Sequence, residues 1–285
     1  MIATGILFAI AAMLFWGIAD FVLMMAIRKT SSFKAFFWNQ TIATVIFLLA
    51  IPFILPLAPM SPWILLLLVA NGFLAAASFF VFCKALDAGP LSLVSPVSAS
   101  FGVLTLLLGI IFLHEVPTLL QLAGIVIAII GLILASFKLQ ELLKVKLHLA
   151  SDGLKYAFLA MIAWAVFYIL LDPLIASIGW LQTIVFLSVF AFIFILLYAF
   201  WKKEQVSVPL SDIPILAGAG VLGVLAYSFY GIGVTTEITS IVAPVTSLYP
   251  MVTVLLAWIF LKEKIEWNQA IGIALIIIGL VVLAL

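Results

Sequence analysis

Residues 92–134 read SLVSPVSASFGVLTLLLGIIFLHEVPTLLQLAGIVIAIIGLIL, and residues 240–282 read SIVAPVTSLYPMVTVLLAWIFLKEKIEWNQAIGIALIIIGLVV. The two stretches align without a gap at a shift of 148 positions and share 18 of 43 residues. Aliphatic identities arise easily in apolar sequence, so the proline, glycine and polar identities carry more weight. These pair Pro96 with Pro244, Thr105 with Thr253, Glu115 with Glu263, Gln121 with Gln269, Gly124 with Gly272, and Gly131 with Gly279. The chain therefore contains an internal repeat.

The same shift extends the repeat toward both ends of the chain. It aligns Gly5 with Gly153 and Trp16 with Trp164. The longest polar stretch, at 138–152, lies mid-chain between the two copies. We predict a first repeat at 1–137, a linker at 138–152 and a second repeat at 153–285.

Composition places the chain in a membrane. Of its 285 residues, 68% are hydrophobic and 8% are charged, and the mean hydropathy is +1.47, whereas soluble domains are about half apolar and a quarter charged. No Lys or Arg precedes the first apolar stretch, so residues 4–27 are predicted to be a retained span and not a signal peptide. Since about 20 apolar residues cross a bilayer, we predict an all-α integral membrane protein of ten transmembrane helices. These are expected at 4–27, 35–56, 63–84, 92–113, 118–137, 153–172, 180–201, 213–234, 240–261 and 267–285.

Five spans per repeat is an odd number, so the second repeat must enter the membrane from the opposite side. Charge supports this inversion, because all 12 Lys and Arg residues lie in or beside the odd-numbered loops. We therefore predict two five-helix inverted repeats. The positive-inside rule then places the odd-numbered loops in the cytoplasm and both termini outside, in the plasma (inner) membrane.

The sequence also resembles a known family. Residues 85–97 read ALDAGPLSLVSPV, residues 112–115 read FLHE, and the second copy has FLKE at 260–263. With the Gly124 to Gly131 helix and Trp16-Gly17, this resembles the EamA-type repeat of the drug/metabolite transporter superfamily, in both copies and over essentially the whole chain. Trp164-Ala165 departs slightly from the pattern. The resemblance implies alternating access around a central cavity lined by helices 1, 3, 4, 6, 8 and 9, with helices 5 and 10 peripheral. Family members move amino acids, other metabolites, nucleotide sugars or drugs.

Signatures of other functional classes are absent from the sequence. There is no Gly-rich phosphate loop with a Lys, and His114 and His148 lack neighbours at metal-ligand spacing. Cys83 is the single cysteine, and the formal net charge is +1. We predict no enzymatic activity, no cofactor, no metal and no nucleic-acid partner.

Polar and aromatic residues inside the spans are the candidates for binding a substrate. Asp20 lies one helical turn after Trp16, so both side chains share a face. A carboxyl group there would bind a cationic group or take up a coupling proton; the alternative is an interfacial pair with Arg28 or Lys29. The remaining substrate-binding candidates are Asn71, Phe79, Ser98, Trp164, Tyr168, Tyr227, Tyr230, Thr246 and Tyr249.

A second group of residues has predicted gating or structural roles. Lys84 and Asp87 are expected to form an interfacial pair, with a gate as the alternative. Pro96 and Pro244 weaken equivalent helices, which are expected to form cavity walls unless the prolines merely kink the packing. Glu115 and Glu263 are expected to fix loop geometry in both repeats. Asp172 is expected at the outer end of the sixth helix, and the glycines at seven-residue spacing are expected to allow close helix packing.

These observations predict a secondary transporter for a small, partly apolar metabolite, with export of amino acids or related compounds favoured. A proton gradient is the expected driving force and Asp20 the coupling candidate, with uniport as the alternative. Drug efflux and uptake of a neutral solute are rival transport functions. A non-transporting scaffold, receptor or enzyme is the rival from another class. Partners are a small-molecule substrate and membrane lipid, and the protein is expected to be a monomer or a weak homo-oligomer.

Overall fold

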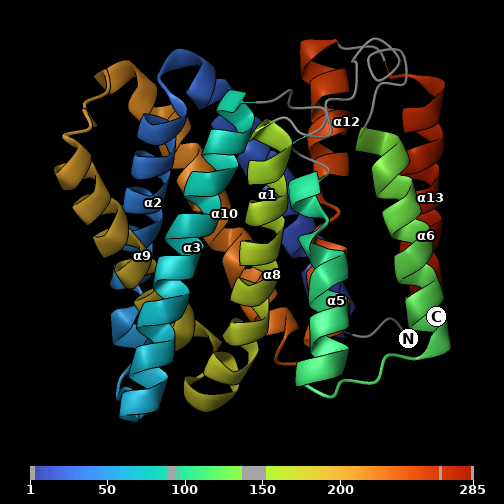
Figure 1. The fold of residues 1–285 in the computed structure, drawn as a ribbon, viewed down its shortest axis with the longest axis horizontal. Helices are drawn as coiled ribbons and strands as arrows, with labels where there is room; N and C mark the ends of the chain where they lie inside the picture. The colour runs from blue at the N-terminus through green and yellow to red at the C-terminus, as the bar shows by residue number, and fades with distance from the viewer. Residues whose placement is uncertain (1–3, 89–93, 95–96, 137–151, 263–264, 284–285) are drawn as a thin grey trace.

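The computed structural model describes residues 4–88, 94, 97–136, 152–262 and 265–283. All regular structure in these residues is helical (Figure 1). The helices of the first repeat are α1 (Thr4–Lys29), α2 (Ser32–Leu49), η1 (Ile51–Ile54), α3 (Pro62–Ala88), α5 (Phe101–Phe112) and α6 (Leu119–Ser136). Those of the second repeat are α8 (Asp152–Ile178), α9 (Trp180–Lys202), η2 (Leu210–Asp212), α10 (Ile213–Gly233), α11 (Thr239–Thr246), α12 (Tyr249–Leu261) and α13 (Trp267–Leu283).

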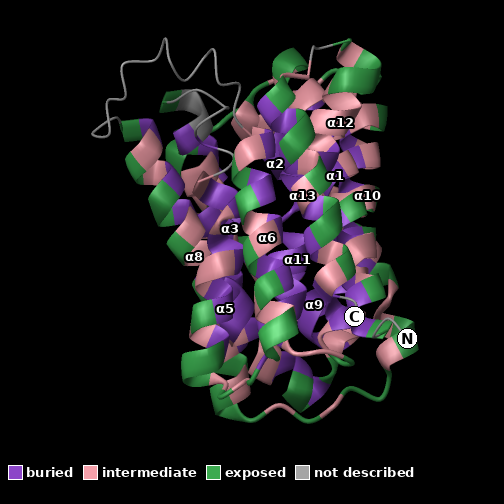
Figure 2. Ribbon diagram, turned by 90° about the vertical axis from the view of Figure 1, so that its right-hand side faces the viewer, coloured by how far each residue is buried: buried purple, intermediate pink, exposed green. Residues whose placement is uncertain are grey.

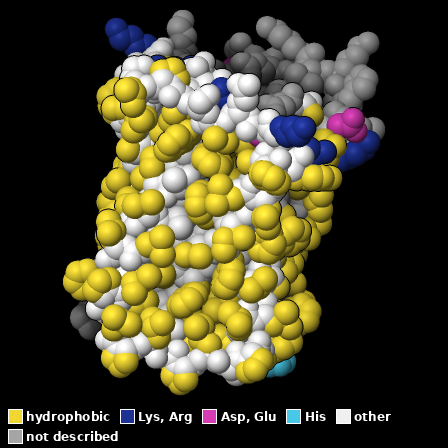
Figure 3. Space-filling model, turned by 90° about the vertical axis from the view of Figure 1, so that its left-hand side faces the viewer, with side chains coloured by type: hydrophobic (Ala, Val, Ile, Leu, Met, Phe, Trp, Pro, Cys, Tyr) yellow, Lys and Arg dark blue, Asp and Glu magenta, His cyan; other side chains and the backbone are white. Residues whose placement is uncertain are grey.

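The outer surface of the bundle is suited to lipid. Within the described residues, eight helical segments are long and apolar enough to cross a membrane, and Val97–Phe112 and Trp267–Leu283 are shorter apolar helices. Figure 3 shows hydrophobic side chains over the flank of the molecule, with Lys and Arg gathered at one end and a His at the other. Buried residues line the inward faces of the helices (Figure 2). The predicted fold class, ten helices in a membrane, is confirmed.

The two repeats are inverted relative to each other, as the contact between α6 and α13 demonstrates. A Cβ atom on Gly124 would lie 2.7 Å from the carbonyl oxygen of Gly279, and one on Gly131 would lie 2.6 Å from that of Gly272. The chain numbers run in opposite directions along this contact, so the helices are antiparallel. Exchanging the repeats by the shift of 148 exchanges the two contacts. The glycines let the backbones approach closely.

The other major helix contacts also join the two repeats. Helix α1 packs on α10, α3 on α8, α2 on α9, and α5 on α11. The 148-residue shift converts the α1–α10 contact into the α8–α3 contact. The interior of the protein is therefore an interface between the two repeats.

The fourth and ninth helices are broken at equivalent positions, where continuous helices were predicted. The amide of Ser100 donates to the carbonyl of Val97, three residues back, at 3.2 Å, and the amide of Leu248 donates to that of Val245 at 3.2 Å. In the second repeat, Pro250 lies in the first turn of α12, where its missing N–H costs least. Each break lies near the middle of its span.

Two further helices differ from the prediction. The second helix ends at Leu49 and a 3₁₀ turn, Ile51–Ile54, follows; Pro52 cannot donate the next α-helical hydrogen bond. The sixth helix continues through Pro173 to Ile178. Asp172 is therefore inside α8 and not at its end.

Candidate functional site

Trp16 of α1 lies at the centre of a cluster of aromatic side chains from both repeats. Its ring centroid lies 5.1 Å from that of Tyr227 and 5.8 Å from that of Tyr230, both on α10. Tyr168 of α8 lies 6.2 Å away, edge to face, and 4.9 Å from Tyr230. These four predicted residues are brought together at the middle of the bundle.

The cluster continues around Trp164, one helical turn before Tyr168. The ring of Trp164 lies 5.3 Å from that of Phe82 on α3 and 5.8 Å from that of Phe101 on α5. Phe101 also stacks on Tyr168 at 4.9 Å. Phe82 and Phe101 were not among the predicted site residues. We call Trp16, Phe82, Phe101, Trp164, Tyr168, Tyr227 and Tyr230 the central aromatic cluster.

The internal repeat relates the members of this cluster to one another. Trp16 is equivalent to Trp164, which lies 148 positions later. At three further pairs of equivalent positions, the first repeat has a Phe and the second has a Tyr. The pairs are Phe79 and Tyr227, Phe82 and Tyr230, and Phe101 and Tyr249. The equivalent of Asp20 is Tyr168. The site therefore has symmetric geometry but asymmetric chemistry.

Asp20 is a carboxylate within the first span, one helical turn after Trp16. It is half-buried, and it lies within electrostatic reach of Tyr168, Tyr227 and Tyr249. Among the described residues, none forms a hydrogen bond or a salt bridge with the Asp20 carboxyl group. Asp20 is therefore not paired with Arg28 or Lys29 at the end of α1. Its carboxyl group is available to a ligand.

Buried polar groups without partners accompany the cluster. Tyr230 and Ser98 are fully buried, and the hydroxyl of each has no hydrogen-bond partner in the part of the chain that the structure describes. Buried polar atoms without a partner are uncommon in folded proteins. Tyr249 begins α12 directly after the break in the ninth helix and is 7% exposed.

Other predicted site residues make contacts within or between helices, and the ring centroid of one of them, Phe79, lies 6.0 Å from that of Phe82 of the central aromatic cluster. The side-chain amide of Asn71 donates to the carbonyl of Phe167 at 3.2 Å and thereby joins α3 to α8. The hydroxyl of Thr246 donates to the carbonyl of Ala243 within α11. Phe79 stacks on Phe36 of α2 at 4.1 Å.

The gating candidates are described only in part. The ammonium of Lys84 lies 4.8 Å from the ring centroid of Phe80 and 5.9 Å from that of Tyr156, neither of which belongs to the central aromatic cluster. Pro244 lies inside α11 and is buried. Pro96, Glu263 and the side chain of Asp87 lie outside the described residues.

A second polar group closes one end of the bundle, the end where α1 begins and α5 ends. The carboxylate of Glu115 accepts hydrogen bonds from the amides of Thr239 and Ser240, each at 2.8 Å. The hydroxyl of Thr239 donates to Oδ1 of Asp172 at 2.7 Å. We call these four residues the even-loop cluster. Glu115 was expected to fix loop geometry, and its carboxylate joins the first repeat to the start of α11.

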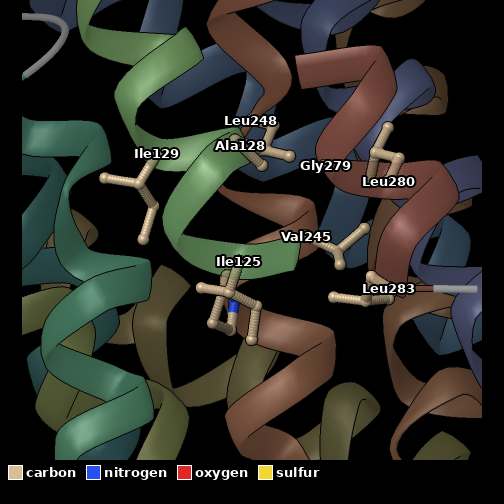
Figure 4. A pocket seen from close by; sticks show the side chains of 9 residues that line it. Ile125, Ala128, Ile129, Val245, Leu248, Gly279, Leu280 and Leu283 are labelled. Atoms are coloured by element: carbon tan, nitrogen blue, oxygen red, sulfur yellow. The ribbon is translucent and has the colours of Figure 1, made fainter. Parts of the chain in front are cut away.

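An apolar pocket lies apart from both groups, between α6, α11 and α13 (Figure 4). Its lining residues are Ile125, Ala128, Ile129, Pro244, Val245, Leu248, Gly279, Leu280 and Leu283. None of these side chains carries a polar group. The pocket therefore offers a ligand no hydrogen bond from a side chain.

The fold and the site together define an α-helical membrane protein whose inverted repeats enclose an aromatic site. The central aromatic cluster takes its side chains from α1, α3, α5, α8 and α10, and Tyr249 of α12 lies within electrostatic reach of Asp20. The sequence model of the EamA-like transporter family matches residues 3–137 and 152–285. The chain belongs to this family.

Two further comparisons support and delimit this assignment. A solved crystal structure of another protein superposes with a TM-score of 0.78 over 99% of this chain and 98% of that chain, at 15% identity, and therefore shares the fold. An uncharacterized protein of Methanocaldococcus jannaschii is 50% identical over 46 residues, which cover 16% of this chain and 34% of that protein. The chain thus spans about a third of the length of that curated relative. Family membership places the chain among membrane transporters of small solutes, which argues against an enzyme.

Proposed function

We propose that this protein is a secondary transporter that moves a small, partly apolar metabolite across the plasma (inner) membrane by alternating access. The observation that carries the proposal is the central aromatic cluster, which lies mid-span and takes side chains from both repeats. A site built on an interface between inverted repeats changes its access when one repeat rocks against the other. The protein would act as a monomer or a weak homo-oligomer.

Amino acids or related compounds are the favoured cargo, and export is the favoured direction. Aromatic walls with a few hydroxyl groups suit a ligand that is partly apolar and partly hydrogen-bonding. Charge argues against a polyanion such as a nucleotide, because no Lys or Arg of the described residues contacts the cluster. Drug efflux and uptake of a neutral solute are the rival transport functions, and a non-transporting scaffold or receptor is the rival from another class.

The described conformation suits one half of an alternating-access cycle. The even-loop cluster ties α11 to α8 and to the loop after α5 at one end of the bundle. Tyr230, which lies within electrostatic reach of that cluster, is fully buried, whereas Asp20 and Trp16 are half-buried. These contacts and the burial of Tyr230 support a conformation that is closed toward the even-numbered loops. If the odd-numbered loops are cytoplasmic, this conformation faces inward.

Asp20 is the proposed coupling residue. A carboxyl group inside a span is costly to keep charged, so a proton or a cationic cargo is its natural partner. An inward proton gradient would then drive export, with uniport as the alternative.

Counterflow in proteoliposomes tests the transport function. Vesicles loaded with a mixture of unlabelled amino acids and amphipathic amines are expected to take up the corresponding radiolabelled compounds in the presence of the protein. Trp16→Ala should abolish this uptake, whereas Trp201→Ala, which removes an exposed indole at a helix end, should preserve it. Absence of exchange for every compound in the wild-type protein would refute transport of this cargo class and favour the scaffold.

A further inference from the structure

We infer that the cargo is an amphipathic amine with a single positive charge and no carboxylate, whose ammonium group lies at Asp20 and whose apolar body lies against the central aromatic cluster. This inference rests on the proposed transport function and specifies its substrate class. Of the proposed cargo class, amino acids and related compounds, it selects the related amines, and it departs from that proposal in placing zwitterionic amino acids second.

The charges around the cluster favour a cation. The charged groups within electrostatic reach of its tyrosines and of Tyr249 are Asp20, Asp172 and Glu115, and no Lys or Arg of the described chain is among them. The carboxylate of an amino acid would find no counter-charge there, and an unpaired charge in a low-dielectric site is costly. An amine meets a free carboxylate at Asp20 and avoids this cost.

The aromatic rings favour the same ligand. Trp16 lies one helical turn before Asp20, on the same face of α1. A cation beside the carboxylate is therefore close to an indole, the side chain that binds cations most strongly through its face. Tyr227 lies 5.1 Å from that indole and adds a second ring with a hydroxyl group.

The asymmetry between the repeats sets the orientation of the ligand. Tyr227 and Tyr249 lie within electrostatic reach of Asp20, so the ammonium is expected on the side of these phenol groups. Around Trp164, the neighbouring rings of Phe82 and Phe101 carry no hydroxyl. The apolar body of the cargo is thus expected on the side of Trp164. The buried hydroxyl of Tyr230, which has no hydrogen-bond partner among the described residues, is available to a polar substituent.

A matched ligand series tests the inference by binding, independently of transport. The probes are 2-phenylethylamine, L-phenylalanine, 3-phenylpropionate and 2-phenylethanol, which share a phenyl ring and differ in charge. Their affinities for the purified full chain in nanodiscs are measured by isothermal titration calorimetry. We expect the amine to bind about tenfold or more tightly than each of the other three, the effect of one desolvated charge-assisted contact.

Two variants separate a specific contact from a folding defect. Asp20→Asn should remove the preference for the amine, and Glu204→Gln, which neutralises an exposed carboxylate, should retain it. Thermal unfolding without ligand checks that both variants fold. Equal or tighter binding of L-phenylalanine, absence of binding by the amine, or an unchanged preference in folded Asp20→Asn would each overturn the inference.

The proposed transport function and the proposed ligand class can each be refuted without refuting the other. Binding of the amine without counterflow would sustain the assigned ligand class and refute transport. Counterflow of L-phenylalanine without counterflow of 2-phenylethylamine would sustain transport and refute the ligand class.

Discussion

Oε1 of Glu115 accepts a hydrogen bond from the backbone amide of Thr239 at 2.8 Å, although 124 residues separate the two in sequence. The second carboxylate oxygen accepts from the next amide, that of Ser240. A carboxylate at the start of a helix satisfies amides that have no partner within the helix and interacts favourably with its dipole. This contact fastens the start of α11 to the other repeat, so its loss should open that end of the bundle.

We therefore predict that Glu115→Gln exposes the even-loop end. In a Ser240→Cys background, an impermeant maleimide should label the new thiol several-fold faster when Glu115 is also replaced. Ser240 is fully buried, so its labelling rate reports opening. Glu237→Gln is the matched control, because Glu237 lies at the same end and its carboxylate accepts from the adjacent amide of Ile238. Equal labelling rates with and without Glu115 would show that this contact does not hold the end closed.

A second prediction concerns the contact between α6 and α13. Gly131→Ala places a methyl group 2.6 Å from the carbonyl oxygen of Gly272, so the two backbones must separate. Overpacking of this kind costs about 1–3 kcal/mol, and the midpoint of thermal unfolding in detergent should fall. Gly218→Ala is the control, because its nearest neighbour would be a methyl group of Val22 at 3.9 Å. Similar unfolding midpoints for the two variants would contradict the close backbone contact.

The pairing of helices between the repeats was largely predictable from the sequence, because a single shift of 148 residues aligns the two repeats. Inversion follows from the odd number of spans, and it predicts that equivalent helices, such as those of Gly131 and Gly272, can pack antiparallel. The breaks at Ser100 and Leu248 were not predicted. Mean hydropathy over a span does not register such a break, although Ser98, Thr246 and Ser247 lie beside the two positions.

The site was predictable only in part. Trp16, Tyr168, Tyr227 and Tyr230 carry polar atoms within spans, which marked them as candidates. Phe82 and Phe101 did not stand out among 24 phenylalanines, since a phenyl group packs equally well against lipid or a cavity. The alignment of the two repeats could have identified Phe82 and Phe101, because it pairs them with Tyr230 and Tyr249. The partner of Glu115 could not be read from local sequence, because it comes from the other repeat.

The phenyl–phenol asymmetry leads to a third prediction. Tyr227→Phe removes a hydroxyl group near Asp20 and should weaken cargo binding several-fold, because one hydrogen bond contributes about 0.5–1.5 kcal/mol. Phe79→Tyr adds a hydroxyl at the equivalent position of the first repeat, where the ring stacks on Phe36, and should not restore affinity in the double variant. Titration calorimetry with the same cargo compares the three proteins. Restored affinity would mean that the two repeats are chemically interchangeable.

The orientation of the protein in its membrane gives a fourth prediction. The single native thiol, Cys83, is buried, so wild-type protein should react slowly with an impermeant maleimide. In intact cells, Thr118→Cys, in an even-numbered loop, should be labelled, and Lys203→Cys, in an odd-numbered loop, should be labelled only after the cells are opened. The opposite result would place the basic end outside and reverse the proposed direction of transport.

Replacement of Asp20 by Asn gives the last prediction, on energy coupling. The amide keeps the size of the carboxyl group but cannot release or take up a proton. Asp20→Asn should therefore abolish accumulation driven by a pH gradient in proteoliposomes, while exchange of cargo at saturating concentration continues. Asp212→Asn, which alters a carboxylate at the start of α10 beside the basic end, should leave both activities intact. Accumulation at the wild-type level in Asp20→Asn would remove Asp20 from the coupling role, whereas absence of pH-driven accumulation in the wild-type protein would favour uniport.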